Sequence, residues 1–198
     1  MISARMKPQV VKVIAPLCRG LLKIGITPDL MTVLGTLIVV IGSFTLLANG
    51  EIAASILIIG LALLTDLLDG TMARLSESGP STWGNFLDST LDRVSDASIL
   101  IGLALYLHSE NDKLFVAVLI TIGTSSLVPY ARAKAESLGI NCTGGFAERT
   151  ERLLILGIAG LLHLLGFKWA MDLGVWVLLL TSFITILQRM AIVWRATR

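Results

Sequence analysis

Four aspartates stand out in the sequence because they lie in and beside segments that are otherwise apolar. Asp66 and Asp69 are three residues apart, and Asp88 and Asp92 are four residues apart. Residues with either separation share one face of a helix, so each pair is expected to point in one direction. An ionised carboxylate near hydrocarbon costs about 2.5–3.5 kcal/mol even on lenient insertion scales. Because the cost is this large, we expect the four carboxylates to have a function.

Three kinds of chemistry compete to explain these carboxylates. Salt bridges with Arg74 and Arg93 leave an excess of negative charge, since two arginines do not neutralise four aspartates. A proton or cation pathway usually places its acidic groups near the membrane midplane, whereas these lie at predicted helix ends. Oxygen ligands favour Mg²⁺, Mn²⁺ or Ca²⁺, and Mg²⁺ is commonly shared between carboxylates and substrate phosphates. We therefore predict that all four aspartates bind divalent metal beside a diphosphate.

The elements that position the aspartates are predicted to be membrane-spanning helices. Of the 198 residues, 55% are hydrophobic and only 15% are charged, and the apolar residues form long blocks. A hydrocarbon core of about 30 Å needs about 20 helical residues. The segments of suitable length are 30–49, 53–74, 84–107, 113–136, 150–166 and 171–194. The second and third are joined by a short loop, so their aspartate pairs are expected to face each other.

We predict an all-α integral membrane protein that forms a single domain over residues 1–198. Six transmembrane helices occupy residues 30–195, and an N-terminal juxtamembrane amphipathic helix occupies residues 1–25, where basic and apolar positions alternate at helical spacing. With both termini on one side, that side collects every lysine and arginine except Lys113 and Lys168. Basic residues in short loops mark the cytoplasmic side. The predicted location is therefore the cell membrane, with both termini and the aspartates facing the cytoplasm.

The residues around the aspartates fit a phosphate ligand. Gly70 and Ala73 leave room beside the second helix, Gly84 permits close approach one turn before Asp88, and Arg74 supplies a planar donor fork for phosphate. The complete pattern is Asp66-x-x-Asp69-Gly70-x-x-Ala73-Arg74 followed by Gly84-x-x-x-Asp88-x-x-x-Asp92. This pattern, together with the six-helix layout and the N-terminal helix, resembles the signature of the CDP-alcohol phosphotransferase family.

The resemblance implies a reaction in which a phosphatidyl group moves from CDP-diacylglycerol to an alcohol and CMP is released. By similarity, Asp66, Asp69, Asp88 and Asp92 hold two divalent ions, Mg²⁺ or Mn²⁺, and Asp92 is also the general base that takes the proton of the attacking hydroxyl. The residues that the resemblance assigns to the CDP-lipid are Pro28, Asp29, Thr32, Asp66, Asp69, Gly70, Ala73, Arg74, and Ser81 or Thr82.

A second, basic set of residues indicates that the acceptor alcohol carries a phosphate. The stretches "RAKAE" (132–136) and "ERTER" (148–152) resemble most those of the actinobacterial phosphatidylinositol phosphate synthases, which use inositol 1-phosphate. By that resemblance, the acceptor phosphate is bound by Arg132, Lys134, Arg152 and Arg195. Free inositol or choline would not need these cations. Positive charge on the cytoplasmic side of a membrane protein is the simpler explanation for any single one of them.

Two alternatives stay open from the sequence. Glycerol 3-phosphate is also an anionic acceptor and would give phosphatidylglycerol phosphate. A carboxylate-lined cation transporter would use the aspartates without releasing CMP. An intramembrane prenyltransferase shares the aspartate, metal and diphosphate chemistry, but its aspartate spacing matches poorly. The family resemblance further implies a homodimer, membrane lipids surround the predicted spans, and we expect no nucleic-acid partner.

Overall fold

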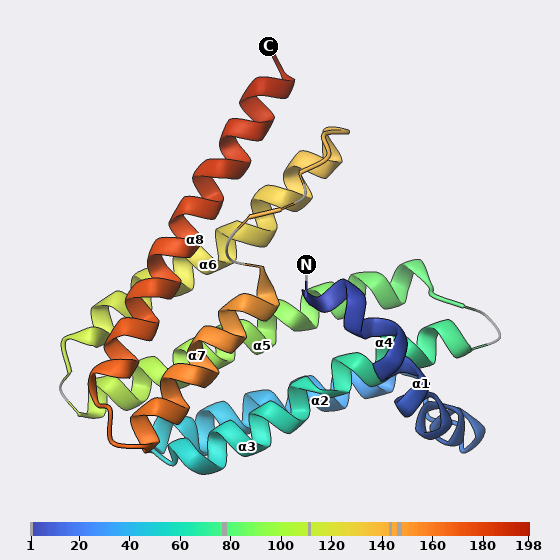
Figure 1. Cartoon of the computed structure of the whole chain (residues 1–198), viewed down its shortest axis with the longest axis horizontal. Helices are drawn as coiled ribbons and strands as arrows, with labels where there is room; N and C mark the ends of the chain where they lie inside the picture. Colours follow the sequence, from blue (N-terminus) through green and yellow to red (C-terminus); the bar gives the residue numbers. More distant parts are fainter. Residues whose placement is uncertain (1, 77–78, 111, 143, 146–147) are drawn as a thin grey trace. The chain divides into compact units, whose positions relative to one another are not determined.

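The computed structural model describes residues 2–76, 79–110, 112–142, 144–145 and 148–198, with side chains described from residue 13 onward. Every regular element in these ranges is helical (Figure 1), so the predicted all-α class is confirmed. The helices are α1 (Ile2–Lys23), α2 (Pro28–Thr45), the 3₁₀ turn η1 (Leu47–Asn49), α3 (Ile52–Leu63), α4 (Thr65–Leu75), α5 (Thr82–Ser109), α6 (Leu114–Ser137), α7 (Arg149–Leu164) and α8 (Trp169–Ala196).

Four helical segments of the described residues are long and apolar enough to cross a membrane. They are Pro28–Asn49, Ile52–Leu75, Leu114–Ser137 and Trp169–Ala196. The other two predicted spans do form helices, α5 and α7, but they differ from these four. The first half of α5 carries several charged residues, and the 16 residues of α7 extend only about 24 Å against a hydrocarbon core of about 30 Å. Length and hydropathy therefore support four spans directly.

The second predicted span is interrupted at Leu64, which separates α3 from α4. The amide of Leu64 lies within 3.3 Å of the carbonyl of Gly60 and 3.2 Å of that of Leu61, a shared bond common at helix ends. The hydroxyl of Thr65 donates to the carbonyl of Ala62 at 2.6 Å. A side-chain bond of this kind competes with the helical backbone bonds and often bends a helix. The apolar α3 and the aspartate-bearing α4 are therefore separate helices.

The chain divides into two compact units, which we call unit 1 and unit 2. Unit 1 comprises residues 1–42 and 58–96, and unit 2 comprises residues 43–57 and 97–198. In unit 1, α1 packs against α4, and Figure 1 shows α1 lying across it. The thiol of Cys18, on α1, lies 3.7 Å from the carbonyl of Leu68, on α4. All four predicted metal ligands belong to unit 1.

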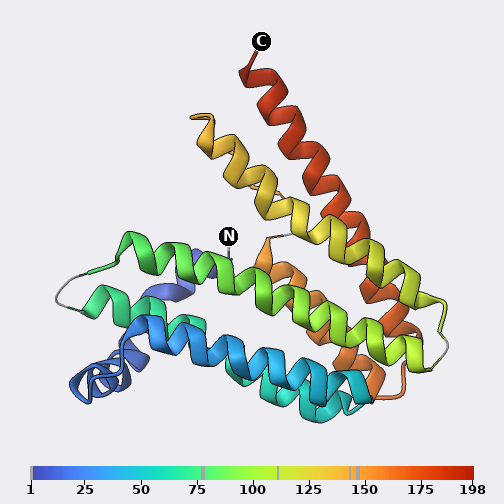
Figure 2. The same cartoon turned by 180° about the vertical axis from the view of Figure 1, so that it is seen from behind.

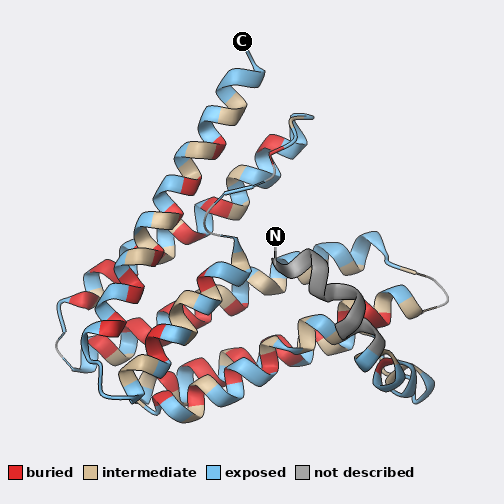
Figure 3. Cartoon of the chain, in the orientation of Figure 1, coloured by how far each residue is buried: buried red, intermediate tan, exposed pale blue. Residues whose placement is uncertain are grey.

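The core of unit 2 is built on α8, against which both α6 and α7 pack, and Figures 1 and 2 show these helices side by side. Buried positions recur along α8 (Figure 3). Small residues allow this packing, since a Cβ added at Gly174 would lie 2.5 Å from the Cβ of Ala159. Between α6 and α8 the buried hydroxyls of Ser125 and Ser182 lie 3.4 Å apart. The C-terminal helices thus form a close-packed group with polar residues inside it.

Candidate active site

Helix α4 carries the first aspartate pair, and its two carboxylates have different surroundings. Asp66 lies in the first turn and is half-buried, whereas Asp69, one turn later, is only 5% exposed. The carboxylate of Asp69 accepts a hydrogen bond of 2.6 Å from the hydroxyl of Thr32 on α2. It also interacts electrostatically with Asp66 and with Asp88. The sequence-based expectation that the two aspartate pairs lie near each other therefore holds for these three residues.

Helix α5 carries the second pair, and its start is fixed by a side-chain cap. The hydroxyl of Ser81 accepts a hydrogen bond of 2.8 Å from the amide of Gly84, which satisfies one of the free amides at the helix start. Asp88 and Asp92 follow on one face of this helix and are both half-buried. Ser81, predicted to contact the nucleotide, therefore also has a structural role, and Thr82 is the first residue of α5.

The glycines of the motif have two different roles. A Cβ added at Gly84 would lie 3.2 Å from Oδ1 of Asp29, so this glycine lets α5 pack against the start of α2. A Cβ added at Gly70 would have no protein atom within 4 Å among the described residues. Gly70 thus borders open space one residue after Asp69. Close packing within the protein accounts for a glycine at position 84. No such packing surrounds Gly70, and the open space beside it fits a bound ligand.

The remaining residues predicted to bind the CDP-lipid also belong to unit 1. Pro28 is the first residue of α2, where its fixed φ suits a helix start, and Asp29 follows it in the first turn. Ala73 is half-buried on α4. The side chain of Arg74 is exposed, and its Nη2 lies 3.3 Å from the hydroxyl of Thr71. An exposed guanidinium with five N–H donors is well suited to a phosphate.

The donor set fits a hard divalent cation. Carboxylates accompanied by the hydroxyl of Thr32 are oxygen donors, which Mg²⁺ and Mn²⁺ prefer. As the side chains stand, no three His, Cys, Asp or Glu residues in the described ranges are gathered tightly enough to hold a metal ion. The electrostatic contact among Asp66, Asp69 and Asp88 nevertheless places three carboxylates in one neighbourhood. Their residue types and proximity fit a metal, and the role of each as a ligand stays a prediction.

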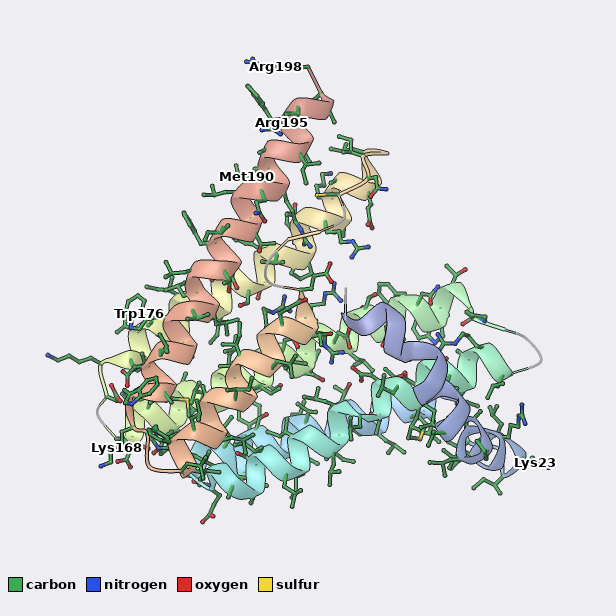
Figure 4. The ribbon with its side chains drawn as sticks, viewed as in Figure 1. Lys23, Lys168, Trp176, Met190, Arg195 and Arg198 are labelled. Carbon is green, nitrogen blue, oxygen red and sulfur yellow. The ribbon has the colours of Figure 1, made fainter. Side chains whose placement is uncertain are left out.

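The residues predicted to bind the acceptor phosphate belong to unit 2 and have different surroundings. Arg152 is buried in the first turn of α7, with 7% of its surface exposed. Arg132 is exposed, and its Nε pairs with Glu136 at 2.8 Å. Lys134 is exposed and, being two residues from Arg132, projects from another face of α6. Arg195 is exposed near the C-terminal end of α8, at the end opposite Lys168 (Figure 4).

The structure adds Arg189, which the sequence analysis did not assign to the site. Arg189 lies on α8, is 3% exposed, and interacts electrostatically with Arg132, Arg152 and Glu148. It donates to the carbonyl of Val128, and its Nη2 lies 3.4 Å from the carbonyl of Gly144. Its Nε is buried without a hydrogen-bond partner in the described part of the chain. We call Arg132, Arg152 and Arg189 the cation cluster.

A signal for Arg189 was present in the sequence. An arginine inside an apolar segment is expensive to bury and by default marks a functional site. Arg189 is such a residue, five positions before the end of the predicted span 171–194. Its burial follows from packing among α6, α7 and α8, and no spacing within one helix reveals that packing.

Comparison with known proteins decides the family. The profile of the CDP-alcohol phosphatidyltransferase family matches residues 25–192, which include every predicted site residue except Arg195. The chain belongs to this family. The resemblance drawn from the aspartate motif is thus confirmed, and the chain is an enzyme of the phosphatidyltransferase class.

Relatives within the family are similar over nearly their whole length. The phosphatidylinositol phosphate synthase of Mycobacterium tuberculosis (strain ATCC 25618 / H37Rv) is 39% identical over 188 residues, covering 92% of this chain and 86% of that protein. The archaetidylinositol phosphate synthase of Pyrococcus horikoshii is 36% identical over 187 residues, covering 94% and 93%.

Solved structures of the Mycobacterium tuberculosis phosphatidylinositol phosphate synthase share the fold. The structure with CDP-DAG bound matches this chain with a TM-score of 0.87 and 38% identity, covering 92% of this chain and 94% of that one. The structure in complex with manganese and citrate matches with a TM-score of 0.84 and 38% identity, covering 90% and 88%.

Proposed function

We propose that this enzyme transfers the phosphatidyl group of CDP-diacylglycerol to D-myo-inositol 1-phosphate, forming phosphatidylinositol phosphate and releasing CMP. The observation that carries the proposal is the aspartate group of α4 and α5, in a fold that matches a family member with CDP-DAG bound at a TM-score of 0.87. The two relatives described above differ by name in their lipid but share inositol phosphate. That shared part of the name favours inositol phosphate as the acceptor.

The CDP-lipid site is proposed to lie along unit 1. Gly70 leaves space for the diphosphate, and the exposed Arg74 binds its oxygens. Pro28, Asp29, Thr32, Ala73, and Ser81 or Thr82 complete the proposed contacts with the nucleotide. Two divalent ions, Mg²⁺ or Mn²⁺, held by Asp66, Asp69, Asp88 and Asp92 would supply positive charge that stabilises the diphosphate as negative charge develops on it. A solved relative contains manganese, which supports this choice of cofactor.

Asp92 is proposed as the general base. It takes the proton from the acceptor hydroxyl while the hydroxyl oxygen forms a bond to the phosphorus that carries the diacylglycerol. The phosphoanhydride bond to CMP breaks, and CMP leaves with the bridging oxygen. The half-buried setting of Asp92 on α5 suits a group that exchanges protons with a substrate.

The acceptor phosphate is proposed to bind the cation cluster, with Lys134 and Arg195 as the further residues that the resemblance implies. Arg152 and Arg189 are both buried, and a buried guanidinium gains most from an anionic partner because water competes little there. Such a cluster recognises phosphate and does not by itself distinguish inositol 1-phosphate from glycerol 3-phosphate. Phosphatidylglycerol phosphate synthesis is therefore the second candidate function. Membership of a transferase family argues against the transporter alternative.

The finer architecture is part of the same proposal. We propose six transmembrane helices in a single domain, with α5 and α7 added to the four supported by hydropathy, and with α1 lying as an amphipathic helix at the membrane surface. Nearly all basic residues then face the cytoplasm, as do both termini. A homodimer in the cell membrane is proposed from the family resemblance.

The test is CMP release from CDP-diacylglycerol by purified protein with Mg²⁺ or Mn²⁺. Inositol 1-phosphate, glycerol 3-phosphate, free inositol and serine are offered in separate reactions. We expect release with inositol 1-phosphate and none with free inositol or serine. Release with glycerol 3-phosphate alone would assign the second candidate function, and release with none of the four would refute both.

A further inference from the structure

A hydrogen bond links α2 to the predicted metal site. The hydroxyl of Thr32 lies 2.6 Å from Oδ2 of Asp69, a residue 37 positions later in the chain. Both side chains are buried, Thr32 with 8% and Asp69 with 5% of their surface exposed. A threonine hydroxyl has one hydrogen, and its other acceptor, the carbonyl of Pro28, is farther away at 3.1 Å. The shorter bond to the carboxylate is charge-assisted and stronger.

The approach of α2 to α4 is made possible by glycine. Gly35 follows Thr32 by nearly one turn on the same face of α2, and a Cβ added there would overlap Oγ1 of Thr65, the first residue of α4. Two turns further along, a Cβ added at Gly42 would lie 3.2 Å from the side chain of Ile59 on α3. At Gly35, α2 therefore approaches the start of α4 as closely as a residue without a side chain allows. That approach brings the short threonine side chain within reach of Asp69.

Helix α4 is also held from α1. The thiol of Cys18 lies 3.7 Å from the carbonyl of Leu68, one residue before Asp69, and Cys18 is fully buried. Leu68 thus contacts α1 through its backbone carbonyl, and Asp69 contacts α2 through its carboxylate. These contacts at two adjacent residues restrict the position of α4 and the orientation of the Asp69 side chain.

We propose that Thr32 is a positioning residue that fixes the carboxylate of Asp69 for metal binding. This inference rests on the proposed function, in which Asp69 is a metal ligand. The hydroxyl engages Oδ2 and thereby fixes the orientation in which the carboxylate of Asp69 meets the ion. Groups that orient a metal ligand in this way typically change metal affinity about 10- to 100-fold when they are removed. The hydroxyl thereby has a task other than the cytidine contact that the family resemblance implies.

The test compares three variants of the purified full-length protein. Thr32→Val removes the hydroxyl and keeps the shape, Thr32→Ser keeps the hydroxyl, and Thr36→Val makes the same change at an equally buried threonine one turn later on α2. Mn²⁺ affinity is measured by the electron paramagnetic resonance signal of free Mn²⁺. The apparent KM for CDP-diacylglycerol is measured at saturating Mn²⁺.

We expect Thr32→Val to weaken Mn²⁺ binding about tenfold, Thr32→Ser to restore it to near the original value, and Thr36→Val to leave it unchanged. Unchanged Mn²⁺ affinity in Thr32→Val would overturn the proposal, and an increase only in the KM for CDP-diacylglycerol would assign the hydroxyl to the nucleotide instead. Equal losses in Thr32→Val and Thr36→Val would also overturn it, because they would indicate general damage to packing.

The two failures are distinguishable. If the unaltered protein binds Mn²⁺ but releases no CMP with any acceptor, the proposed function fails, and the Mn²⁺ affinities of the variants still decide the role of Thr32. If the unaltered protein binds no Mn²⁺, the positioning role is refuted directly.

Discussion

The aspartate site of unit 1 and the cation cluster of unit 2 are assembled in opposite ways. Asp66 and Asp69 lie within one turn of α4, and Asp88 and Asp92 lie one turn apart on α5. The cation cluster takes one residue from each of three helices, α6, α7 and α8. Spacing within a helix is visible in a sequence, whereas a cluster made by packing between helices is not. The chemistry of phosphoryl transfer was therefore readable from sequence, and the full set of cations was not.

The two sites also satisfy their charges differently. The buried carboxylate of Asp69 accepts from a side chain, the hydroxyl of Thr32, while the buried guanidinium of Arg189 donates to backbone carbonyls of Val128 and Gly144. Backbone carbonyls are neutral, and the field of Glu148, which favours the charge of Arg189, is opposed by those of Arg132 and Arg152. We predict that the phosphate of the acceptor adds negative charge here, which is the electrostatic preference proposed for the cation cluster.

Substitution at the aspartate site should have the largest effect. Asp92→Asn keeps the size of the side chain and removes the base, and we expect CMP release to fall at least about a thousandfold with every acceptor. Asp172→Asn, at an exposed position in the first turn of α8, is the matched control. Near-normal turnover in Asp92→Asn, in a protein that elutes and melts like the original, would contradict the assignment of the base.

Substitution in the cation cluster should act on one substrate only. Arg152→Gln is expected to raise the KM for the phosphorylated acceptor about 10- to 100-fold, because a charged hydrogen bond is lost from a buried setting, and to leave the KM for CDP-diacylglycerol nearly unchanged. Arg195→Gln is expected to have a smaller effect, since Arg195 is exposed and its charge is screened. Equal increases for both substrates in Arg152→Gln would count against an acceptor-phosphate role.

The two motif glycines should respond to alanine with opposite changes in stability. Gly70→Ala adds a methyl group into open space within a helix, where alanine is favoured over glycine by about 0.5–1 kcal/mol, so the melting temperature should hold or rise while the KM for CDP-diacylglycerol increases. Gly84→Ala forces a methyl group to within 3.2 Å of Asp29 and should lower the melting temperature. An unchanged KM for CDP-diacylglycerol in Gly70→Ala would contradict the proposed position of the diphosphate beside α4.

The smallest expected effect concerns Cys18. The prediction is about the chemical reactivity of its thiol and not about the rate of CMP release. Burial raises the pKa of the Cys18 thiol, so the reactive thiolate is scarce at neutral pH. We expect a maleimide to label Cys18 at least about tenfold more slowly in the folded protein than in denaturant. The rate should rise with pH toward the raised pKa. Cys18 in a Cys142→Ser protein gives the measurement without interference, and fast labelling there would show that α1 separates readily from α4.

The parts of the fold that depend on local composition were predictable. The all-α class and the helices around each apolar block follow from periodicity and length. The interruption at Leu64 was not predictable, because it depends on the hydrogen bond of Thr65 to Ala62 inside a continuous apolar run. The sequence also gave no sign that Thr32 bonds Asp69, since that contact requires α2 to approach α4 at Gly35.

The length of α8 determines where Arg189 lies relative to the bilayer. Its 28 residues extend about 42 Å, and the hydrocarbon of a bilayer is about 30 Å thick. Lys168 and Trp169 suit one polar boundary of the bilayer, and Arg189, 20 residues after Trp169, lies about 30 Å from it along the helix axis. A helix that crosses the bilayer with Lys168 and Trp169 at one boundary therefore brings the guanidinium of Arg189 to the opposite boundary. We predict that the phosphate of a water-soluble acceptor meets this guanidinium at the level of the headgroups and not among the lipid tails.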